Sequence, residues 1–339
     1  MDIKQTLRTL TESTGVSGAE FPAAQCALEL LREYVPNAEI DSFGNVTAVI
    51  SSPDPEAKTL MLDAHIDQIG MIVTYIDGEG FLKVGACGGL DMRTMLAQTV
   101  IVHGKQQING VVCTLPPHVS SDHSKVPEVG EISVDIGMTK EEAERVVSLG
   151  DRVTVVSRFR EIGNLVSAPS LDDRSGVCVI LRALELLKER RLRYNIAVCF
   201  SAQEETGERG VKMAAFRLAP DEAIAVDVSF GRTPDSAVHE TAELGSGAMI
   251  GASAVLDRSM TEKLRELAES SDIPYTMEVM PSSTGTNADA ISVSRDGVKC
   301  CTVSVPIRYM HTSIETMDVN DIEYAARLIC EYAGGDIDA

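Results

Sequence analysis

From residue 164 onward, apolar strand-like runs alternate with helical segments along the chain. The pattern predicts helices over residues 172–191, 211–218, 260–272 and 319–334, and strands over 194–203, 222–230, 273–280 and 298–306. Before residue 70 it predicts two amphipathic helices, a hairpin around a Gly44-Asn45 turn and a buried strand over residues 59–65. Strands that alternate with helices are typical of parallel sheets with both faces covered. We therefore predict an α/β fold with a mixed, mostly parallel sheet flanked by helices.

A different pattern interrupts this alternation between residues 70 and 163. Short β-type runs such as IGMIVTYI, TVIVHG and INGVVCTL are separated there by Gly-rich turns. We expect a small β-barrel or sandwich inserted into the α/β unit, and of the two we favour the barrel. The predicted domains are residues 1–69 together with 164–339, and an insertion over residues 70–163.

Composition narrows the choice of partners. The 339 residues carry a formal net charge of -21, which argues against nucleic acids and anionic membrane surfaces as partners, because both require a cationic face. Eight cysteines lie mostly in apolar runs with no CxxC spacing, and the N-terminal residues lack the apolar stretch of a signal peptide. No window of the sequence is apolar enough to span a membrane. We expect a cytoplasmic protein with reduced thiols.

Acids and histidines occur where several apolar strands end. His65 ends the strand predicted over 59–65 and Asp67 follows two residues later, so in an extended segment both side chains point to the same face. One could ligate a metal while the other orients it. The alternative is that His65 is an ordinary hydrogen-bonded histidine near a strand end. The motif by itself is weak evidence for a metal site.

Two acidic pairs follow. Asp172 and Asp173 open a predicted helix, where capping alone would need only one carboxylate. Glu204 and Glu205 lie just beyond a buried strand, where neighbouring carboxylates raise each other's pKa unless a cation lies between them. One could be a metal ligand and the other a free base, and the spacing leaves the two glutamates interchangeable. A solvated turn remains the alternative for this pair.

Two single residues complete the set. Asp227 is the one charge within an apolar strand, so it must be paired, capped or metal-bound. His311 follows another apolar strand, where a loop histidine is the alternative. Together the segments supply two histidines, two aspartates and one glutamate, plus a second glutamate without an assigned ligand role. This inventory fits two divalent metal ions, with Zn or Co favoured and Mn possible.

The order of these motifs along the chain resembles one family. The segments DAHIDQIG, LDDRSG, QEETGERG, VDV and RYMHTSIE, with VSGAE, FGN and PPH beside them, are similar to those of the dimetal tetrahedral (TET) aminopeptidases. These are the glutamyl or deblocking aminopeptidases, some of which carry endoglucanase labels. The resemblance spans essentially the whole chain and implies a zinc-peptidase-type fold. It also implies removal of the N-terminal residue from peptides that have a free N-terminus.

The resemblance also implies a role for each residue. It makes His65, Asp172 and Asp227 the ligands of one metal, and Asp172, Glu205 and His311 the ligands of the other, with Asp172 bridging, Asp67 orienting His65 and Glu204 the general base. Members of the family assemble through the β insertion into dimers and hollow tetrahedral dodecamers. We therefore expect a homo-oligomer, with residues 70–163 as the oligomerisation domain.

Some positions depart from the family pattern. Members commonly read GTDA where this chain has Asn287 as the third residue, and a proline is common where Ser313 stands. Neither position is a ligand in the assignment that the resemblance implies. Lys212 and Arg232, which follow the glutamate pair and Asp227, could favour an acidic N-terminal residue, although both could equally be solvated or paired with other acids.

Three rival functions remain at this stage. A glycoside hydrolase also uses paired carboxylates, but adjacent glutamates cannot by themselves flank a glycosidic bond, and sugar subsites favour the aromatic residues that make up only 4% of this chain. A related dimetal carboxypeptidase or amidohydrolase would not require a free amine in its substrate. An inactive scaffold would not need the complete set of ligands and base.

Overall fold

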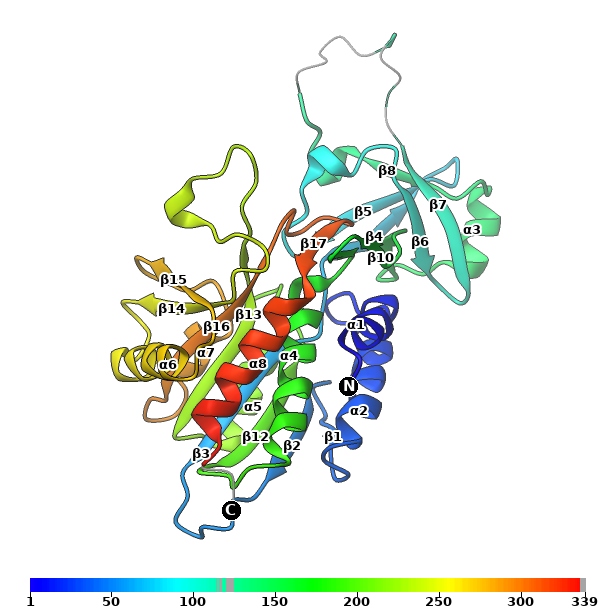
Figure 1. Cartoon of the computed structure of the whole chain (residues 1–339). Coiled ribbons are helices and arrows are strands. Elements are labelled where there is room, and N and C mark those ends of the chain that lie inside the picture. Colours follow the sequence, from blue (N-terminus) through cyan, green and yellow to red (C-terminus); the bar gives the residue numbers. More distant parts are fainter. Residues whose placement is uncertain (114, 116–117, 120–124, 336–339) are drawn as a thin grey trace.

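The computed structural model describes residues 1–113, 115, 118–119 and 125–335, so the prolines of the PPH motif lie outside the described residues. A mixed eight-stranded sheet forms the centre of the molecule, in the order β1-β2-β12-β3-β13-β16-β14-β15 (Figure 1). Its strands are β1 (Glu39–Ile40), β2 (Val46–Ile50), β3 (Thr59–His65), β12 (Asn195–Ser201), β13 (Glu222–Phe230), β14 (Ala248–Ser253), β15 (Tyr275–Met280) and β16 (Lys299–Ile307). The four central strands, β12, β3, β13 and β16, run parallel to one another. This arrangement confirms the predicted fold class.

Helices cover both faces of this sheet because its central strands are apolar on both sides. One face packs against α1 (Ile3–Glu12), α2 (Phe21–Arg32), α4 (Leu171–Leu187), α6 (Arg258–Ser270) and α8 (Val319–Ala333). The other face packs against α5 (Arg209–Leu218) and α7 (Ala288–Ser292). Strand β3 shows the alternation, since Leu60 and Leu62 belong to the first core and Met61 to the second. Aspartates at positions 2, 257 and 318 cap α1, α6 and α8 by accepting hydrogen bonds from backbone N–H groups.

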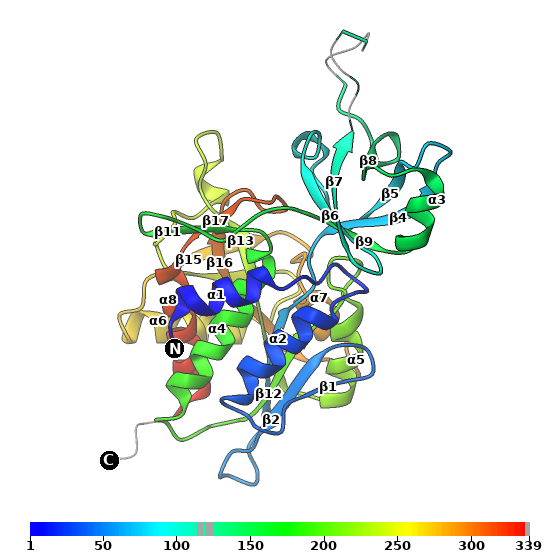
Figure 2. The same cartoon turned by 90° about the vertical axis from the view of Figure 1, so that its right-hand side faces the viewer.

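The inserted segment contains a closed antiparallel barrel. Its strands are β4 (Gly70–Ile76), β5 (Leu82–Cys87), β6 (Thr99–His103), β7 (Gln107–Cys113), β8 (Ser133–Asp135) and β9 (Arg152–Val155), with α3 (Lys140–Val146) and the short helices η1 (Met92–Thr94) and η2 (Val129–Glu131) beside them. The barrel has an apolar core of its own. Figures 1 and 2 show it at the upper right, outside the helices that cover the large sheet. The predicted domain boundaries at residues 69/70 and 163/164 stay a prediction.

A third, three-stranded sheet lies between these parts, and the sequence pattern did not predict it. Strand β11 (Leu165–Ala168) pairs antiparallel with both β10 (Arg160–Ile162) and β17 (Glu315–Asp318). Ala168 faces Glu315, so the residues that precede α4 lie beside the residues that follow β16. Strand β14, helix α7 and η3 (Val238–Glu240) were also not predicted. Within the described residues, no helix combines the length and apolar character needed to cross a membrane.

Candidate active site

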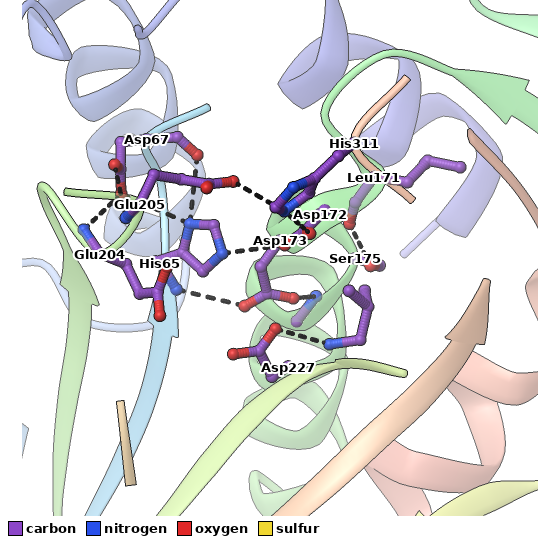
Figure 3. Close-up of polar contacts among 12 residues, drawn as sticks. His65, Asp67, Leu171, Asp172, Asp173, Ser175, Glu204, Glu205, Asp227 and His311 are labelled. Carbon is purple, nitrogen blue, oxygen red and sulfur yellow. Dashed lines mark hydrogen bonds and ion pairs between the residues drawn. The ribbon is translucent and has the colours of Figure 1, made fainter. Parts of the chain in front are cut away.

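The predicted ligands converge at one edge of the large sheet. His65 is the last residue of β3, and the neighbouring β12 ends at Ser201, three residues before Glu204. Asp227 lies near the end of β13, which runs parallel to β3 on its other side. Because the carboxyl ends of parallel strands meet at one edge, three distant segments deliver their polar side chains to the same place. Figure 3 shows these side chains pointing toward one another.

His65 lies between two aspartates. Its Nε2 is 2.9 Å from Asp172 Oδ1, and its Nδ1 is 3.2 Å from the backbone oxygen of Asp67 (Figure 3). The backbone N–H of His65 donates to Asp173 Oδ2 at 3.2 Å. The imidazole is only 2% exposed. Its orientation is therefore fixed from both ring nitrogens, with Nε2 directed at the carboxylate cluster.

Asp67 joins β3 to the turn that carries the glutamate pair. Its carboxylate accepts hydrogen bonds from the backbone N–H groups of Glu204 at 2.9 Å and Glu205 at 3.2 Å, and from Ser17 Oγ at 2.6 Å. Asp67 is completely buried. It lies beside His65, as predicted, and it also holds the backbone of both glutamates, which the sequence did not suggest.

The two aspartates at the start of α4 have different surroundings. Asp172 faces both histidines, with Oδ1 2.9 Å from His65 Nε2 and Oδ2 3.3 Å from His311 Nε2. Asp173 accepts a hydrogen bond from the backbone N–H of Gly176 at 2.8 Å and groups with His65 and Asp227 as a possible metal-binding set. The sequence pattern did not predict that Asp173 lies beside His65 and Asp227. The sequence signal for it was the pair of adjacent aspartates at the start of a helix.

His311 reaches the same cluster from the segment between β16 and β17. Its Nε2 is 3.4 Å from Glu205 Oε1, and its Nδ1 is 2.9 Å from the backbone oxygen of Gly89. Glu315 is a buried carboxylate that accepts hydrogen bonds from the backbone N–H groups of His311 at 2.9 Å and Asp172 at 3.0 Å. Sequence reasoning also missed Glu315, and its position four residues after His311 in a short strand gave little signal.

Burial gives this cluster unusual protonation behaviour. It raises the pKa of Glu204 to about 7 and of Glu205 to about 8, and it raises the pKa of Asp227 well above its ordinary value. The hydrogen bond to Asp172 raises the pKa of His311 to about 9. Burial opposes ionisation of Asp172, but hydrogen bonds from the two histidines outweigh it and lower the pKa of that carboxyl. Without further positive charge beside them, the two buried glutamates and Asp227 therefore resist ionisation.

Divalent cations fit these residues. Two overlapping groups, His65 with Asp173 and Asp227, and His65 with Asp172 and Glu205, have candidate ligand atoms that all lie within 4.8 Å of one another. Imidazole nitrogens and carboxylate oxygens without thiolates are typical ligands of zinc, cobalt and manganese. A cation would also supply the missing positive charge. The site is thus a possible metal-binding group of histidines and acids.

Comparison with known proteins identifies the family. A family model described as M42 glutamyl aminopeptidase matches residues 44–328. The chain belongs to this M42 family. A lysyl aminopeptidase of Pyrococcus furiosus is 32% identical to the chain over 332 residues, which cover 95% of the chain and 94% of the relative. The family and its named relatives make the chain a peptide hydrolase of the aminopeptidase class.

Solved structures agree with this membership. The aminopeptidase APDkam598 of Desulfurococcus kamchatkensis superposes with a TM-score of 0.92 at 32% identity, covering 99% of this chain and 95% of that chain. The TET1 peptidase of Pyrococcus horikoshii, described as assembling into a tetrahedron or a large octahedral shell, has a TM-score of 0.85 at 29% identity. It covers 99% of this chain and 100% of that one. The fold and length of the M42 chain are thus shared with these relatives throughout.

The edge of the large sheet that carries these residues opens into a cavity of about 430 Å³. Beyond the candidate ligands, its wall includes Ser229, Phe230 and Glu278, and the described residues that line it include no lysine or arginine. Lys212 is exposed, and its Nζ donates to the backbone oxygen of Gly207 at 2.8 Å. Arg232 lines an adjoining cavity of about 600 Å³ and pairs with Glu243 at 3.0 Å. A role for the Lys212 and Arg232 side chains in selecting acidic substrates stays a prediction.

Proposed function

We propose that the chain is a dimetal aminopeptidase. In this proposal His65, Asp172 and Asp227 hold one divalent cation, Asp172, Glu205 and His311 hold the second, and Glu204 is the general base. The observation that carries the proposal is the position of Asp172, whose two carboxylate oxygens face the two histidines separately. A carboxylate in that position suits a ligand shared by two ions.

Zinc or cobalt are the cations we favour, with manganese as a further possibility. Bound at this site, they would polarise the scissile carbonyl, lower the pKa of a water molecule and offer a ligand position to the free α-amine of the substrate. The chain's own residues keep the ligands in place, because Glu315 holds the backbone of Asp172 and His311, and Asp67 holds the backbone of Glu205. Such supporting hydrogen bonds fix ligand orientation.

Glu204 has the properties of a general acid and base. Its backbone is held by Asp67, and its side chain lines the cavity beside His65 and Asp227. Burial raises its pKa to about 7, and a base works best when its pKa lies near the working pH. We infer that the Glu204 carboxylate takes a proton from the attacking water and passes it to the nitrogen of the leaving peptide.

The decisive experiment compares Glu204→Gln with Glu208→Gln. Glu208 lies in the same turn but is not among the residues that line the cavity. We expect Glu204→Gln to keep its bound metal and its stability while its kcat falls by about 10²–10⁴-fold, the usual contribution of a general base. Glu208→Gln should remain active. A fully active Glu204→Gln enzyme would disprove the assignment of the base.

Substrate and chelator panels test the reaction class. Activity on peptides should disappear with EDTA and return with added Co²⁺ or Zn²⁺, and a peptide with an acetylated N-terminus should not be cleaved. Cleavage of the acetylated peptide would favour a carboxypeptidase or amidohydrolase. Chelator-resistant activity on a β-glucan would favour a glycoside hydrolase.

We also propose that the chain forms a homo-oligomer through the barrel of residues 70–163, with residues 1–69 and 164–339 as the catalytic unit. Support comes from the description of the similar TET1 peptidase, which assembles into closed shells. Assemblies from a dimer to a tetrahedral dodecamer are expected. Light scattering coupled to size exclusion will measure the mass, and a monomer at all concentrations would contradict this proposal.

A further inference from the structure

The loop that follows strand β5 reaches from the barrel to the candidate metal ligands. The backbone oxygen of Gly89 lies 2.9 Å from His311 Nδ1. The neighbouring Gly88 is equally close to the cluster, since a Cβ atom placed on it would lie 2.9 Å from Glu205 Oε2. A segment of the inserted barrel therefore contacts two of the side chains proposed to hold the second cation.

The contact from Gly89 determines how the His311 ring can act. A carbonyl oxygen only accepts hydrogen bonds, so His311 Nδ1 must carry a hydrogen. In the neutral ring the lone pair is then on Nε2, the nitrogen that faces Asp172 and Glu205 at 3.3 and 3.4 Å. The His311 ring is 33% exposed and faces the carboxylates only through Nε2. The contact between Nδ1 and the Gly89 oxygen therefore fixes the plane of the ring.

The segment around Gly89 has local hydrogen bonds of its own. The backbone N–H of Leu90 donates to the oxygen of Gly88 at 3.2 Å, and the Asp91 side chain accepts from the N–H of Arg93 at the start of η1. The loop therefore has a defined shape that comes from the insertion and not from the α/β unit.

We propose that Gly89 is a positioning residue of the metal site. Its carbonyl fixes the tautomer and orientation of His311, so the inserted barrel is a structural part of the second metal position as well as a candidate assembly domain. This inference rests on the proposed function, because it takes His311 as a ligand. Hydrogen bonds to the outer nitrogen of a metal-binding histidine typically account for about 10–100-fold in metal affinity.

The position also explains why a residue without a side chain stands there. A Cβ atom on Gly89 would lie 2.8 Å from His311 Nδ1 and 3.1 Å from Cε1. The backbone of Gly89 is not in the left-handed region, so an alanine there would be disturbed only by the histidine ring. Gly78, in the turn between β4 and β5, is a matched control because a Cβ there would meet nothing within 4 Å and its backbone is likewise not left-handed.

The test compares Gly89→Ala with Gly78→Ala in the full chain after removal of metal. Co²⁺ alone is titrated and followed by calorimetry, with size exclusion run in parallel to check that the assembly is unchanged. We expect Gly89→Ala to bind one equivalent of Co²⁺ about 10–100-fold more weakly than the wild type and the other equivalent unchanged. Gly78→Ala should bind both as the wild type does. Equal binding by the two variants would overturn the inference.

A double-mutant cycle with His311→Ala separates positioning from a general structural effect. Removing the imidazole removes both the hydrogen bond and the clash, so Gly89→Ala should cause no further loss of Co²⁺ affinity in that background. A further loss there would overturn the inference. If Gly89→Ala alone fails to fold, the double variant should fold as His311→Ala does, and its failure to fold would also count against the inference. A wild type that does not bind two equivalents of Co²⁺ would instead refute the proposed function.

Discussion

Replacing Asn287 with aspartate would place a second carboxylate against Asp63 in the protein interior. Asn287 Nδ2 donates hydrogen bonds to Asp63 Oδ2 at 2.7 Å and to Ser201 Oγ at 2.8 Å. Asp63 is fully buried and Asn287 is 2% exposed. Burial raises the pKa of Asp63 from 3.8 to about 6, so this carboxylate is ionised at pH 8 and uses the amide as a donor. Aspartate has almost the same shape as asparagine but offers no N–H group.

Two free-energy terms determine how much stability Asn287→Asp loses. Losing a hydrogen bond to a charged group costs about 1.5–3 kcal/mol. The variant must also keep one proton between the two carboxyls, which costs about 1.4 kcal/mol for each pH unit above the pKa of the unfolded chain. At pH 8, about four pH units above that pKa, the proton term is about 6 kcal/mol. The retained proton restores a hydrogen bond between the two carboxyls and so offsets the first term, and we therefore expect a loss of unfolding free energy of about 6 kcal/mol.

The sign of the pH dependence is specific. In the wild type, the folded-state pKa of Asp63 lies above its unfolded value, so its contribution to stability is full below pH 4 and falls as the pH rises toward 6, after which it is constant. In the variant, the folded state keeps one more proton than the unfolded chain above pH 6. Its stability relative to the wild type should therefore fall by about 1.4 kcal/mol per pH unit between pH 6 and 8.

Urea unfolding at pH 6, 7 and 8, with metal content held constant, measures this difference. The exchange variant that combines Asp63→Asn with Asn287→Asp is the matched control, because it restores a donor opposite an acceptor at the same two positions. We expect it to recover most of the stability lost by Asn287→Asp alone. A loss that does not change with pH, or two single losses that simply add in the exchange variant, would refute the reasoning.

Two further predictions concern residues behind the ligands. Glu315→Gln leaves one carbonyl oxygen for two backbone N–H donors, so we expect a loss of about 1–3 kcal/mol in urea unfolding and weaker Co²⁺ binding in calorimetry. Unchanged stability would show that water replaces the lost acceptor. Gly176→Ala would place a Cβ atom 2.4 Å from Asp173 Oδ1, so it should lower both stability and Co²⁺ affinity, whereas Gly130→Ala, which meets nothing within 4 Å, should change neither. Wild-type behaviour of Gly176→Ala would contradict the close packing of this carboxylate.

The sequence predicted the parts of the site that come from long apolar strands. His65 ends a buried strand, Asp227 lies within one and the glutamate pair follows one, and such strands are visible in the hydrophobic pattern. Parallel pairing then brings those strand ends to one edge of the sheet. The inserted β-segment was visible because short β-type runs separated by Gly-rich turns interrupt the alternation of strands and helices.

Residues that act through long-range backbone contacts were not predictable in this way. Glu315 lies in the four-residue strand β17, and its role depends on the pairing of that strand with β11, which no local pattern specifies. Gly89 acts through a carbonyl oxygen, which every residue type possesses. Asp173 resembles an ordinary helix cap and does accept a backbone hydrogen bond, so only its distance to His65 and Asp227 reveals more.

The departure at Asn287 has a physical explanation that only the structure reveals. Where members of the family commonly have aspartate, this chain has an amide, and the amide faces the carboxylate of Asp63 on the neighbouring strand β3. A single buried carboxylate, that of Asp63, is stabilised by the amide N–H donor of Asn287. Two adjacent carboxylates at these positions would repel each other. The asparagine is thus matched to the acid that the chain carries two residues before His65.

The net charge of -21 can now be divided by location. Among the described residues, seven carboxylates gather around the two histidines, from Asp67, Asp172, Asp173, Glu204, Glu205, Asp227 and Glu315. Burial raises the pKa of Glu204 and Glu205, and no described lysine or arginine lines the cavity beside them. Divalent cations bound at this cluster would compensate the cost of burying ionised carboxylates. The excess of acid in this chain is therefore partly a property of the site, and only the remainder belongs to the solvated surface.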